Sequence, residues 1–382
     1  MISYSYPPYL FHSGVGNVAE NLVKILSKKN EVFIISGKPL FESNHPYVNT
    51  QGNIFRISVP QIFHPRFDIL YFRLAVQKVA KELLKKYDFD ILHDHQREGV
   101  EIAKYMRRMK LRTKLLAHIH TCIGQLLPFR DLRGIKKYLV ETEEFLNTKM
   151  LKTNFDYDGY IAVSKFQKWY SITHEGISKK IEVLYNPIDT TKYAESSNKE
   201  RKVTFCGFLG FRKRASWVIE AANELINKRK IKAKFVIIGE GTQYNYLRKL
   251  ISKYRLKNNV SLLGSVPECI KIREYQTSLL FTLPSLHESY GQVIVEAMSC
   301  GTPALVSDNS AMRELVKDGE NGLRFSTFNF KEYVDKMEYF LTNEDEAKKM
   351  GRAAREFVLK NASFEVIEKK NCMQFIMSSM NN

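Results

Sequence analysis

The sequence predicts an α/β protein made of two doubly wound domains that face each other across a cleft. The chain has 382 residues, whereas one hydrophobic core rarely grows beyond about 250–300 residues. Apolar, strand-like runs alternate with amphipathic segments of helical length. This alternation is typical of a parallel sheet with helices on both faces. The alternation restarts after residue 200, so we expect two sheets.

The first half of the chain supplies the elements of the first sheet. We expect strands at 32–36, 90–95 and 114–120 and a helix at 75–87. The opening strand is unusually short, because only ISYSY precedes PPYLFHSGVG. Either this strand is genuinely short, or Met1 is an internal methionine of a longer strand.

The second half repeats the pattern with shorter connections. We expect strands at 202–207, 234–239 and 260–264 and helices at 216–229 and 244–255. The polar segment AESSNKE has no apolar periodicity and predicts a linker. We therefore expect a first domain at 1–193, a second at 194–362 and a terminal helix at 363–382 that packs back on the first domain.

Composition limits the class of protein. With 44% hydrophobic and 26% charged residues the chain is typical of a soluble globular protein. The amino terminus has no basic region, and Pro7 and Pro8 stand where a signal peptide requires a continuous apolar stretch. We therefore expect a cytoplasmic protein. Five cysteines without CxxC spacing indicate neither a disulfide framework nor a zinc site.

The net charge of +18 favours anionic partners such as phosphates, nucleic acid or a membrane. We expect no nucleic-acid partner, because RNP-like aromatic and helix-turn-helix signals are lacking. A basic cluster at 104–114 consists of Lys104, Arg107, Arg108, Lys110, Arg112 and Lys114. It is interpreted either as a contact for an anionic membrane surface or phosphorylated acceptor, or as the solvated end of a surface helix.

Chemically informative residues cluster where predicted strands end, which is where parallel sheets bind ligands. In the first half, Gly14 and Gly16 lie ahead of a predicted helix, so backbone amides there can approach an anion. Two HxH pairs stand at or near strand ends: His93 with His95, and His118 with His120. Metal binding by these four is one interpretation, but neither pair comes with a recognisable third ligand.

In the second half, Arg212, Lys213 and Arg214 follow a strand and provide cations for a diphosphate. The loop IIGEGT (237–242) allows a flat base or ribose to lie against backbone. Glu288 is expected in a loop and Glu296 a turn or more inside the next helix. We expect these two carboxylates to accept hydrogen bonds from opposite ends of one long ligand.

Several segments together resemble the family 4 retaining glycosyltransferases. The segment HESYGQVIVEAMSCGTPALVSDNSAMRELVKDGENGLRF is similar to the E-x7-E region of that family. Other similar segments follow the family's order: SGVGNVAENLVKIL, DILHDH, KLLAHIH, DGYIAVSKFQ, KIEVLYNPID, VTFCGFLGFRKR and VIIGEG. The resemblance spans essentially the whole chain. It implies the GT-B fold, with two Rossmann-like domains, an acceptor domain at 1–193 and a nucleotide-sugar-binding domain at 194–362.

The resemblance also implies an activity: transfer of a sugar from a UDP-, GDP- or ADP-sugar to an acceptor hydroxyl, with retained configuration. It implies that Glu296 holds the ribose hydroxyls, Glu288 contacts the donor sugar and Lys213 binds the diphosphate. His120 matches the family's histidine near the reacting sugar. The implied catalytic residues are His120, Glu288 and Lys213. The implied donor-binding residues are Gly16, Gly207, Arg212, Lys213, Arg214, Gly239, Glu288, Ser289, Tyr290, Gly291, Gln292 and Glu296.

One residue departs from the family pattern. The family usually has arginine directly after the glycine that ends this strand, whereas Phe208 follows Gly207 here. Arg212 or Arg214 is expected to compensate, because a leaving diphosphate requires positive charge. No DxD-type motif accompanies the site, so we expect neither a metal nor a cofactor besides the nucleotide-sugar co-substrate.

The acceptor is not encoded in a motif. The charge and the basic cluster favour a glycan or lipid-linked acceptor in cell-envelope polysaccharide, lipopolysaccharide or glycolipid assembly, with the enzyme peripheral at the inner face of the plasma membrane. A small soluble acceptor, such as an aminocyclitol natural product, is the alternative. Two further hypotheses are a non-catalytic basic binding protein on the same fold, and a phosphorylase or nucleotide-sugar epimerase.

Overall fold

A computed structural model describes residues 1–3, 14–39, 47–61, 68–95, 100–121 and 157–370. The chain divides into two compact units, Met1–Pro187 with Ile367–Asn382, and Ile188–Val366. Each unit contains its own sheet. Within the described residues, no helix combines the length and apolar character that crossing a bilayer requires.

The sheet of the first unit has eight strands among the described residues, in the order β3-β4-β2-β1-β5-β6-β7-β8. All neighbours pair in parallel except β3 and β4. The strands are β1 (Ile2–Ser3), β2 (Val32–Pro39), β3 (Tyr47–Gln51), β4 (Ile54–Gln61), β5 (Ile91–Asp94), β6 (Lys114–Ile119), β7 (Gly159–Ala162) and β8 (Ile181–Val183). The helices are α1 (Gly14–Leu26), α2 (Asp68–Lys86), α3 (Val100–Arg108) and α5 (Lys165–Thr173).

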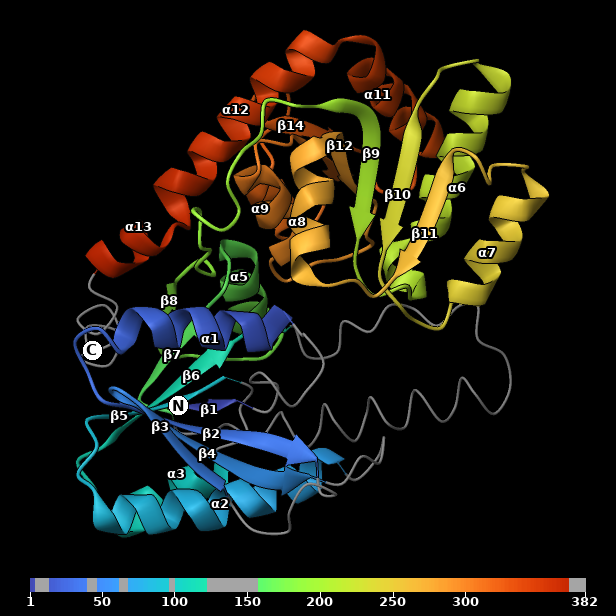
Figure 1. Ribbon diagram of the computed structural model, residues 1–382. Helices are drawn as coiled ribbons and strands as arrows, with labels where there is room; N and C mark the ends of the chain where they lie inside the picture. Colours follow the sequence, from blue (N-terminus) through green and yellow to red (C-terminus); the bar gives the residue numbers. More distant parts are fainter. Residues whose placement is uncertain (4–13, 40–46, 62–67, 96–99, 122–156, 371–382) are drawn as a thin grey trace. The chain divides into compact units, whose positions relative to one another are not determined.

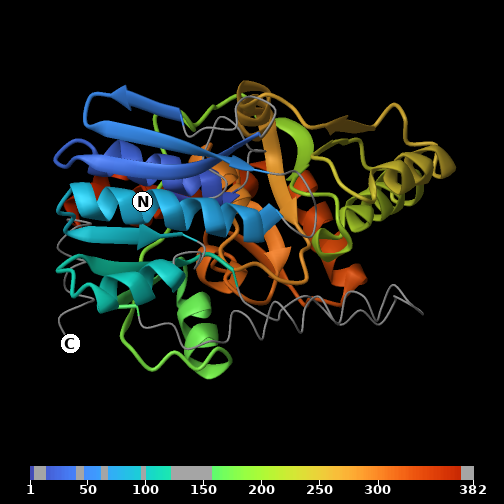
Figure 2. The same ribbon diagram turned by 90° about the horizontal axis from the view of Figure 1, so that it is seen from below.

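Helices cover both faces of this sheet (Figure 1). On one face, Ala19 and Val23 of α1 pack against Val32 and Ile34 of β2. On the other face, α2 and α3 lie beside each other, as Figure 2 shows from below, and complete the larger core. Burial of apolar surface, at roughly 25 cal/mol per Å², is the main force that holds these layers together.

The second unit has a six-stranded parallel sheet among the described residues, in the order β11-β10-β9-β12-β13-β14. The strands are β9 (Glu200–Cys206), β10 (Lys234–Ile238), β11 (Val260–Gly264), β12 (Ser278–Leu283), β13 (Ala304–Ser307) and β14 (Gly322–Phe325). The helices are the 3-10 turn η2 (Phe211–Lys213), α6 (Ala215–Ala222), the π-helical turn η3 (Asn223–Lys228), α7 (Tyr244–Lys253), α8 (Glu268–Thr277), α9 (Gln292–Ser299), α10 (Met312–Leu315), α11 (Phe330–Thr342), α12 (Glu344–Asn361) and α13 (Phe364–Lys369).

Two groups of helices cover the second sheet. Helices α6, α7 and α11 form one contacting set, and α8, α9 and α12 form the other (Figure 1). Two inner strands are buried throughout: every residue of β12 and β13 is inaccessible to solvent or nearly so. A sheet covered on both faces therefore has near-continuous apolar strands, as the sequence pattern indicated.

The prediction of two parallel α/β sheets is confirmed, and the predicted strands at 202–207, 234–239 and 260–264 correspond to β9, β10 and β11. One local prediction is wrong: Gly14 and Gly16 do not precede the first helix but form its first turn. The remainder of the predicted first strand, after Ser3, lies outside the described residues.

The end of the chain begins a final helix. Helix α13 is described from Phe364 to Lys369, and the rest of the predicted terminal helix lies outside the described residues. Within the first unit, Lys28 donates to the carboxylate of Glu368 at 2.6 Å. The division into an acceptor domain at 1–193, a donor domain at 194–362 and a terminal helix at 363–382 stays a prediction.

Candidate active site

The carboxyl ends of β9 and β10 carry two loops that are joined by backbone hydrogen bonds. The amide of Gly207 donates to the carbonyl of Ile238 at 3.0 Å, and the amide of Leu209 donates to Glu240 at 2.7 Å. In addition, the amide of Gln243 donates to the carbonyl of Leu209 at 2.9 Å. The loops 207–214 and 239–243 therefore form one platform at the ligand-binding edge of the sheet.

Gly239 is required by the close approach of these loops. Its φ is +137°, and a Cβ atom there would lie 1.9 Å from the carbonyl oxygen of Gly207. Gly207 itself has a φ of +157°, at the edge of the region that favours glycine. The predicted role of both glycines in donor binding stays a prediction, because loop packing alone already requires Gly239.

Lys213 and Glu288 form a buried ion pair. Lys213 Nζ donates to Oε1 of Glu288 at 2.6 Å, and the two side chains are 13% and 8% exposed. Lys213 ends the 3-10 turn η2 after β9, and Glu288 lies in the loop between β12 and α9. Arg212 joins them: its Nη1 is 3.3 Å from the same carboxylate oxygen and also donates to the carbonyl of His287. Two cations and one carboxylate thus share one small volume.

Glu288 is held in its ionised form. Burial is the largest influence on its pKa and would raise it, but the positive charges of Lys213 and Arg212 together outweigh burial and lower the pKa to about 2. At neutral pH this side chain is therefore a carboxylate that accepts hydrogen bonds. The backbone is fixed as well, because the amide of Glu288 donates to the hydroxyl oxygen of Ser310 at 3.0 Å.

Arg214 points to different partners. It has a positive φ of 51°, and its guanidinium carbon lies 4.4 Å from the ring centroid of Trp217 and 4.9 Å from that of Phe328. It also donates to the carbonyl of Thr327. Burial lowers the pKa of Arg214 to about 10. Arg212, and not Arg214, is therefore the arginine that contacts the ion pair formed by Lys213.

Glu296 occupies a second, separate carboxylate site. It lies in the second turn of α9 and is only 3% exposed. Lys271 of α8 contacts its Oε2 at 2.9 Å, and the hydroxyl of Tyr275 donates to the same oxygen at 3.3 Å. The contacts of Lys271 and Tyr275 with Glu296 were not predicted from the sequence. The two residues are four positions apart, which places them on one face of a helix, and this spacing is the signal that could have indicated them.

The start of α9 lies between the two carboxylates along the chain. Gly291 is its N-cap residue with a φ of +100°, and Gln292 begins the helix. Tyr290 is buried, and Oε1 of Gln292 is buried without a hydrogen-bond partner in the described part of the chain. The structure thus brings Lys213, Arg212, Glu288 and the predicted segment from Ser289 to Gln292 together. The donor-binding roles stay predictions.

The remaining predicted residues belong to the first unit. Gly16 is buried in α1. His120 directly follows β6, and its Nε2 lies 2.9 Å from Nδ1 of His95. Burial lowers the pKa of His120 to about 3, so this imidazole is neutral at physiological pH. A neutral imidazole has one nitrogen that donates and one that accepts, which suits contacts with sugar hydroxyls.

Two family models match adjacent parts of the chain. The model of the Glycosyltransferase Family 4 matches residues 12–192, and the model of the Glycosyl transferases group 1 matches residues 189–357. The two matches meet at the predicted domain boundary and leave only the ends of the chain uncovered.

Individual relatives match over most of their length. The N-acetyl-alpha-D-glucosaminyl L-malate synthase of Bacillus anthracis is 25% identical over 93% of this chain and 91% of its own. A phosphatidyl-myo-inositol mannosyltransferase of Mycolicibacterium smegmatis is 24% identical over 82% and 78%. Among solved structures, Anabaena Alr3699/HepE in complex with UDP and glucose superposes with a TM-score of 0.72 at 17% identity over 98% of both chains.

Both family models and the fold agree. The two parallel α/β sheets match the GT-B architecture of this structural neighbour. The two glutamates that the E-x7-E resemblance identified lie in the loop after β12 and in α9. The chain therefore belongs to the glycosyl transferases group 1, the family 4 glycosyltransferases, and is a nucleotide-sugar-dependent glycosyltransferase.

Proposed function

We propose that this enzyme transfers a sugar from a nucleoside-diphosphate sugar, with UDP-sugars the first candidates, to a hydroxyl of a cell-envelope or lipid-linked glycan. The group formed by Lys213, Arg212 and the buried Glu288 is the observation that carries the donor part of this proposal. UDP as the nucleotide is supported by the complex of Alr3699/HepE. The acceptor part is supported by the distribution of positive charge in the first unit.

The donor site stabilises a leaving group. When the bond between the sugar and the diphosphate breaks, negative charge develops on the diphosphate oxygens, and Lys213 and Arg212 supply fixed positive charge nearby. The carboxylate of Glu288 keeps both cations in place and accepts a hydrogen bond from a sugar hydroxyl. Glu296, held by Lys271 and Tyr275, accepts hydrogen bonds from the ribose.

Retention of configuration follows from attack on the same face that the diphosphate leaves. In this mechanism the leaving phosphate oxygen takes the proton of the acceptor hydroxyl while the new glycosidic bond forms. No carboxylate nucleophile is required. Detection of a covalent glycosyl-enzyme by mass spectrometry of the intact protein during turnover would contradict this route.

The acceptor proposal rests on the basic cluster at 104–114. All six cations are exposed, and they lie at the end of α3 and the start of β6. This position is the amino-terminal edge of the sheet, whereas ligands of parallel sheets bind at the carboxyl-terminal edge. The cluster is therefore suited to hold the enzyme at an anionic surface and not to bind the reacting hydroxyl. This supports the proposal that the enzyme acts at the inner face of the plasma membrane.

A small soluble acceptor is the second candidate, because the Bacillus anthracis relative is named as a synthase of N-acetyl-alpha-D-glucosaminyl L-malate. Sedimentation with vesicles distinguishes the two. We expect the enzyme to bind vesicles with anionic lipids and not neutral ones, and the variant Lys110→Glu/Arg112→Glu to lose this binding. The matched variant Lys249→Glu/Lys257→Glu changes the net charge equally at exposed positions of the second unit. Equal loss of vesicle binding in both variants would show that the cluster has no special part in membrane binding. The small soluble acceptor would then be favoured.

The donor is tested by thermal shift with UDP, GDP, ADP and their common sugars. A nucleotide at a hundred times its dissociation constant stabilises the folded state by about 2.7 kcal/mol. We expect one nucleotide to raise the melting temperature of the wild type and to have no effect on Glu296→Gln. The variant Glu356→Gln, at an exposed position of α12, is the control. If no nucleotide shifts the wild type, the donor proposal fails.

A further inference from the structure

Four histidines, three of them buried, lie on one face of the first sheet. His93 and His95 are two residues apart at the end of β5, and His118 and His120 are two residues apart at the end of β6. Residues two apart on a strand share a face. The register of β5 and β6 places His95 directly beside His118. All four rings are therefore on the same side of the sheet.

The rings are packed against one another. Ring centroids are 5.3 Å apart for His93 and His118, 5.0 Å for His95 and His118, and 4.2 Å for His118 and His120. His93, His95 and His118 are 5%, 0% and 1% exposed. One nitrogen atom from each of these three rings lies within 4.8 Å of the others.

Most of these nitrogens have no hydrogen-bond partner. Within the described residues, Nε2 of His93, Nε2 of His95 and both nitrogens of His118 are buried and unpaired. Leaving a buried polar group unpaired costs about 1–3 kcal/mol. Four such atoms in one small volume are a large cost for a fold, which indicates that a ligand satisfies them.

His120 is positioned to support such a ligand. Its Nε2 lies 2.9 Å from Nδ1 of His95, which leaves Nε2 of His95 directed into the cluster. Histidines that bind metals almost always donate their other ring N–H to an acceptor, which fixes the tautomer and the ring orientation. The pair His95 and His120 has this arrangement when Nδ1–H of His95 donates to His120.

We propose that His93, His95 and His118 bind a divalent transition-metal ion such as Zn²⁺, with His120 as the hydrogen-bond partner of His95. Three histidines with one further position open to water form an established type of zinc site. Zinc–nitrogen bonds of about 2.1 Å in a tetrahedral site require nitrogens about 3.4 Å apart. The planes of His93 and His118 are only 10° apart, so one of these two rings has to turn for both to bind the same ion.

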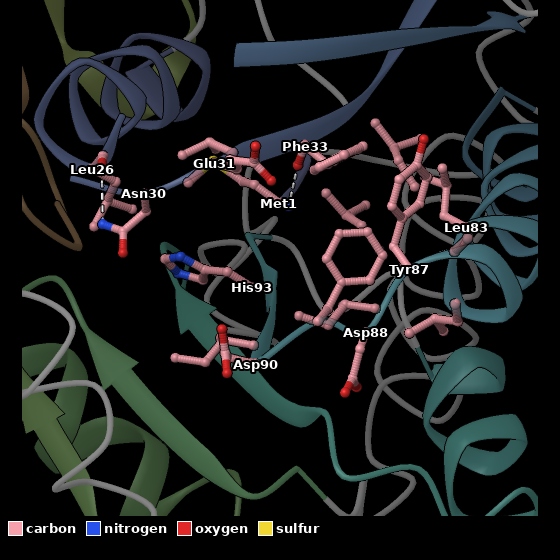
Figure 3. A pocket seen from close by; sticks show the side chains of 18 residues that line it. Met1, Leu26, Asn30, Glu31, Phe33, Leu83, Tyr87, Asp88, Asp90 and His93 are labelled. Atoms are coloured by element: carbon pink, nitrogen blue, oxygen red, sulfur yellow. Dashed lines mark hydrogen bonds between the residues drawn. The ribbon is translucent and has the colours of Figure 1, made fainter. Parts of the chain in front are cut away.

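A cavity of about 360 Å³ lies beside the cluster, and His93 is the one cluster residue that lines it. Figure 3 shows the ring of His93 at its wall, between Asn30 and Asp90. Glu31 and Asp88 also line the cavity. Negative side chains at the mouth of a cavity raise the local concentration of cations. Glu31 and Asp88 therefore favour cations in a cavity that His93 lines.

The expectation that no metal is needed concerns the donor diphosphate and not the first unit. The proposed ion lies in the first unit, joins β5 to β6 and sets the tautomer of His120. His120 is thus a residue whose orientation depends on the metal. The inference does not depend on which sugar donor the enzyme uses.

The test is metal binding by the full-length protein with its purification tag removed, because polyhistidine tags bind the same ions. The protein is stripped with a chelator, exchanged into Zn²⁺ or Co²⁺ and separated from free ions by gel filtration. We expect about one ion per chain by elemental analysis. We also expect the Co²⁺ form to show the intense visible absorption of a four-coordinate site.

Substitution of single histidines tests which residues bind the ion. We expect His118→Gln and His93→Gln to bind the ion at least tenfold more weakly. The control His174→Gln changes an exposed histidine of the same unit and leaves binding unchanged. Circular dichroism establishes that each variant is folded. Full binding by the two cluster variants, or no binding by the wild type, would overturn the proposal.

X-ray absorption of the zinc form keeps the test decisive if the variants do not fold, because it uses the wild type alone. We expect three imidazole nitrogens in the first coordination shell. A shell made of oxygen or sulfur atoms would show that the ion binds elsewhere and would overturn the assignment.

Discussion

The Nζ atom of Lys213 lies 2.6 Å from Oε1 of Glu288, and both side chains are buried where the loops after β9 and β12 meet. A buried ion pair is rarely kept for stability alone, because desolvation costs as much as the attraction returns. Here the pair keeps a positive charge desolvated and oriented at the ligand-binding edge of the sheet. Such a charge acts strongly on any anion that binds next to it.

Substitution of Lys213 is expected to lower the rate more than the stability. We expect Lys213→Ala to reduce kcat/KM by about 10²–10³, since removing one preorganised charge from a transition-state site typically has this effect. The control is Lys228→Ala, which removes an exposed lysine of the same unit. Initial rates of nucleoside-diphosphate release measure both. An unchanged kcat/KM in Lys213→Ala would exclude a role in leaving-group stabilisation.

The two neighbouring arginines are expected to differ. Arg212 contacts Glu288, so Arg212→Ala should weaken donor binding by tenfold or more. Arg214 is held by Trp217, Phe328 and a backbone carbonyl, so Arg214→Ala should change donor affinity less than about twofold and lower the free energy of unfolding by about 1–2 kcal/mol.

Calorimetric titration with the nucleotide and chemical denaturation measure these two effects separately. The reverse result, with donor binding lost in Arg214→Ala and kept in Arg212→Ala, would make Arg214 the residue that compensates for Phe208.

Glu288 is expected to make stability depend on acid pH. Its folded-state pKa of about 2 is below the unfolded value of 4.5, so the carboxylate stabilises the fold above pH 4.5 and this contribution is lost as pH falls toward 2. The difference corresponds to about 3 kcal/mol at neutral pH. Denaturation of the wild type and Glu288→Gln should therefore differ by about 3 kcal/mol at pH 7 and by about 1 kcal/mol at pH 3. A difference that is constant with pH would contradict this assignment.

Gly239 is expected to tolerate no side chain. We expect Gly239→Ala to lower the free energy of unfolding by more than about 3 kcal/mol, because its Cβ would collide with the backbone of Gly207 in addition to the strain of a positive φ. Gly176 also has a positive φ but open space around it. Gly176→Ala should therefore cost only about 1 kcal/mol. Equal losses of unfolding free energy in the two variants would mean that the loops 207–214 and 239–243 separate easily.

The fold was predictable where apolar runs mark strands that are largely buried, as in β9 and β10. Helix α8 was missed because its apolar residues do not form one face, and Tyr275 is its one buried residue among those described. The face it presents to the core is polar: Lys271 and Tyr275 turn toward Glu296. Helices that bury a functional polar group lose the periodicity on which sequence prediction relies.

The site was predictable as a set of residues but not as a set of contacts. The sequence placed Arg212 and Arg214 equally close to Lys213, and only the left-handed backbone at Arg214 turns its side chain toward Trp217. The histidines posed a similar problem. Alternation along a strand predicts that His93 and His95 share a face, whereas the register that brings His118 beside them depends on pairing between strands.

The hydrogen-bonded platform of loops 207–214 and 239–243 separates constant from variable parts of the donor site. Its course is determined by main-chain bonds and by Gly239, which do not depend on side-chain identity. Phe208 and Phe211 project from it with 63% and 59% of their surface exposed. We expect exchange of these aromatic residues to leave the backbone, Lys213 and Arg212 in place. If this edge binds the donor as proposed, the architecture permits a descendant enzyme to acquire a new donor preference through surface substitutions, without losing the cations proposed to stabilise the leaving diphosphate.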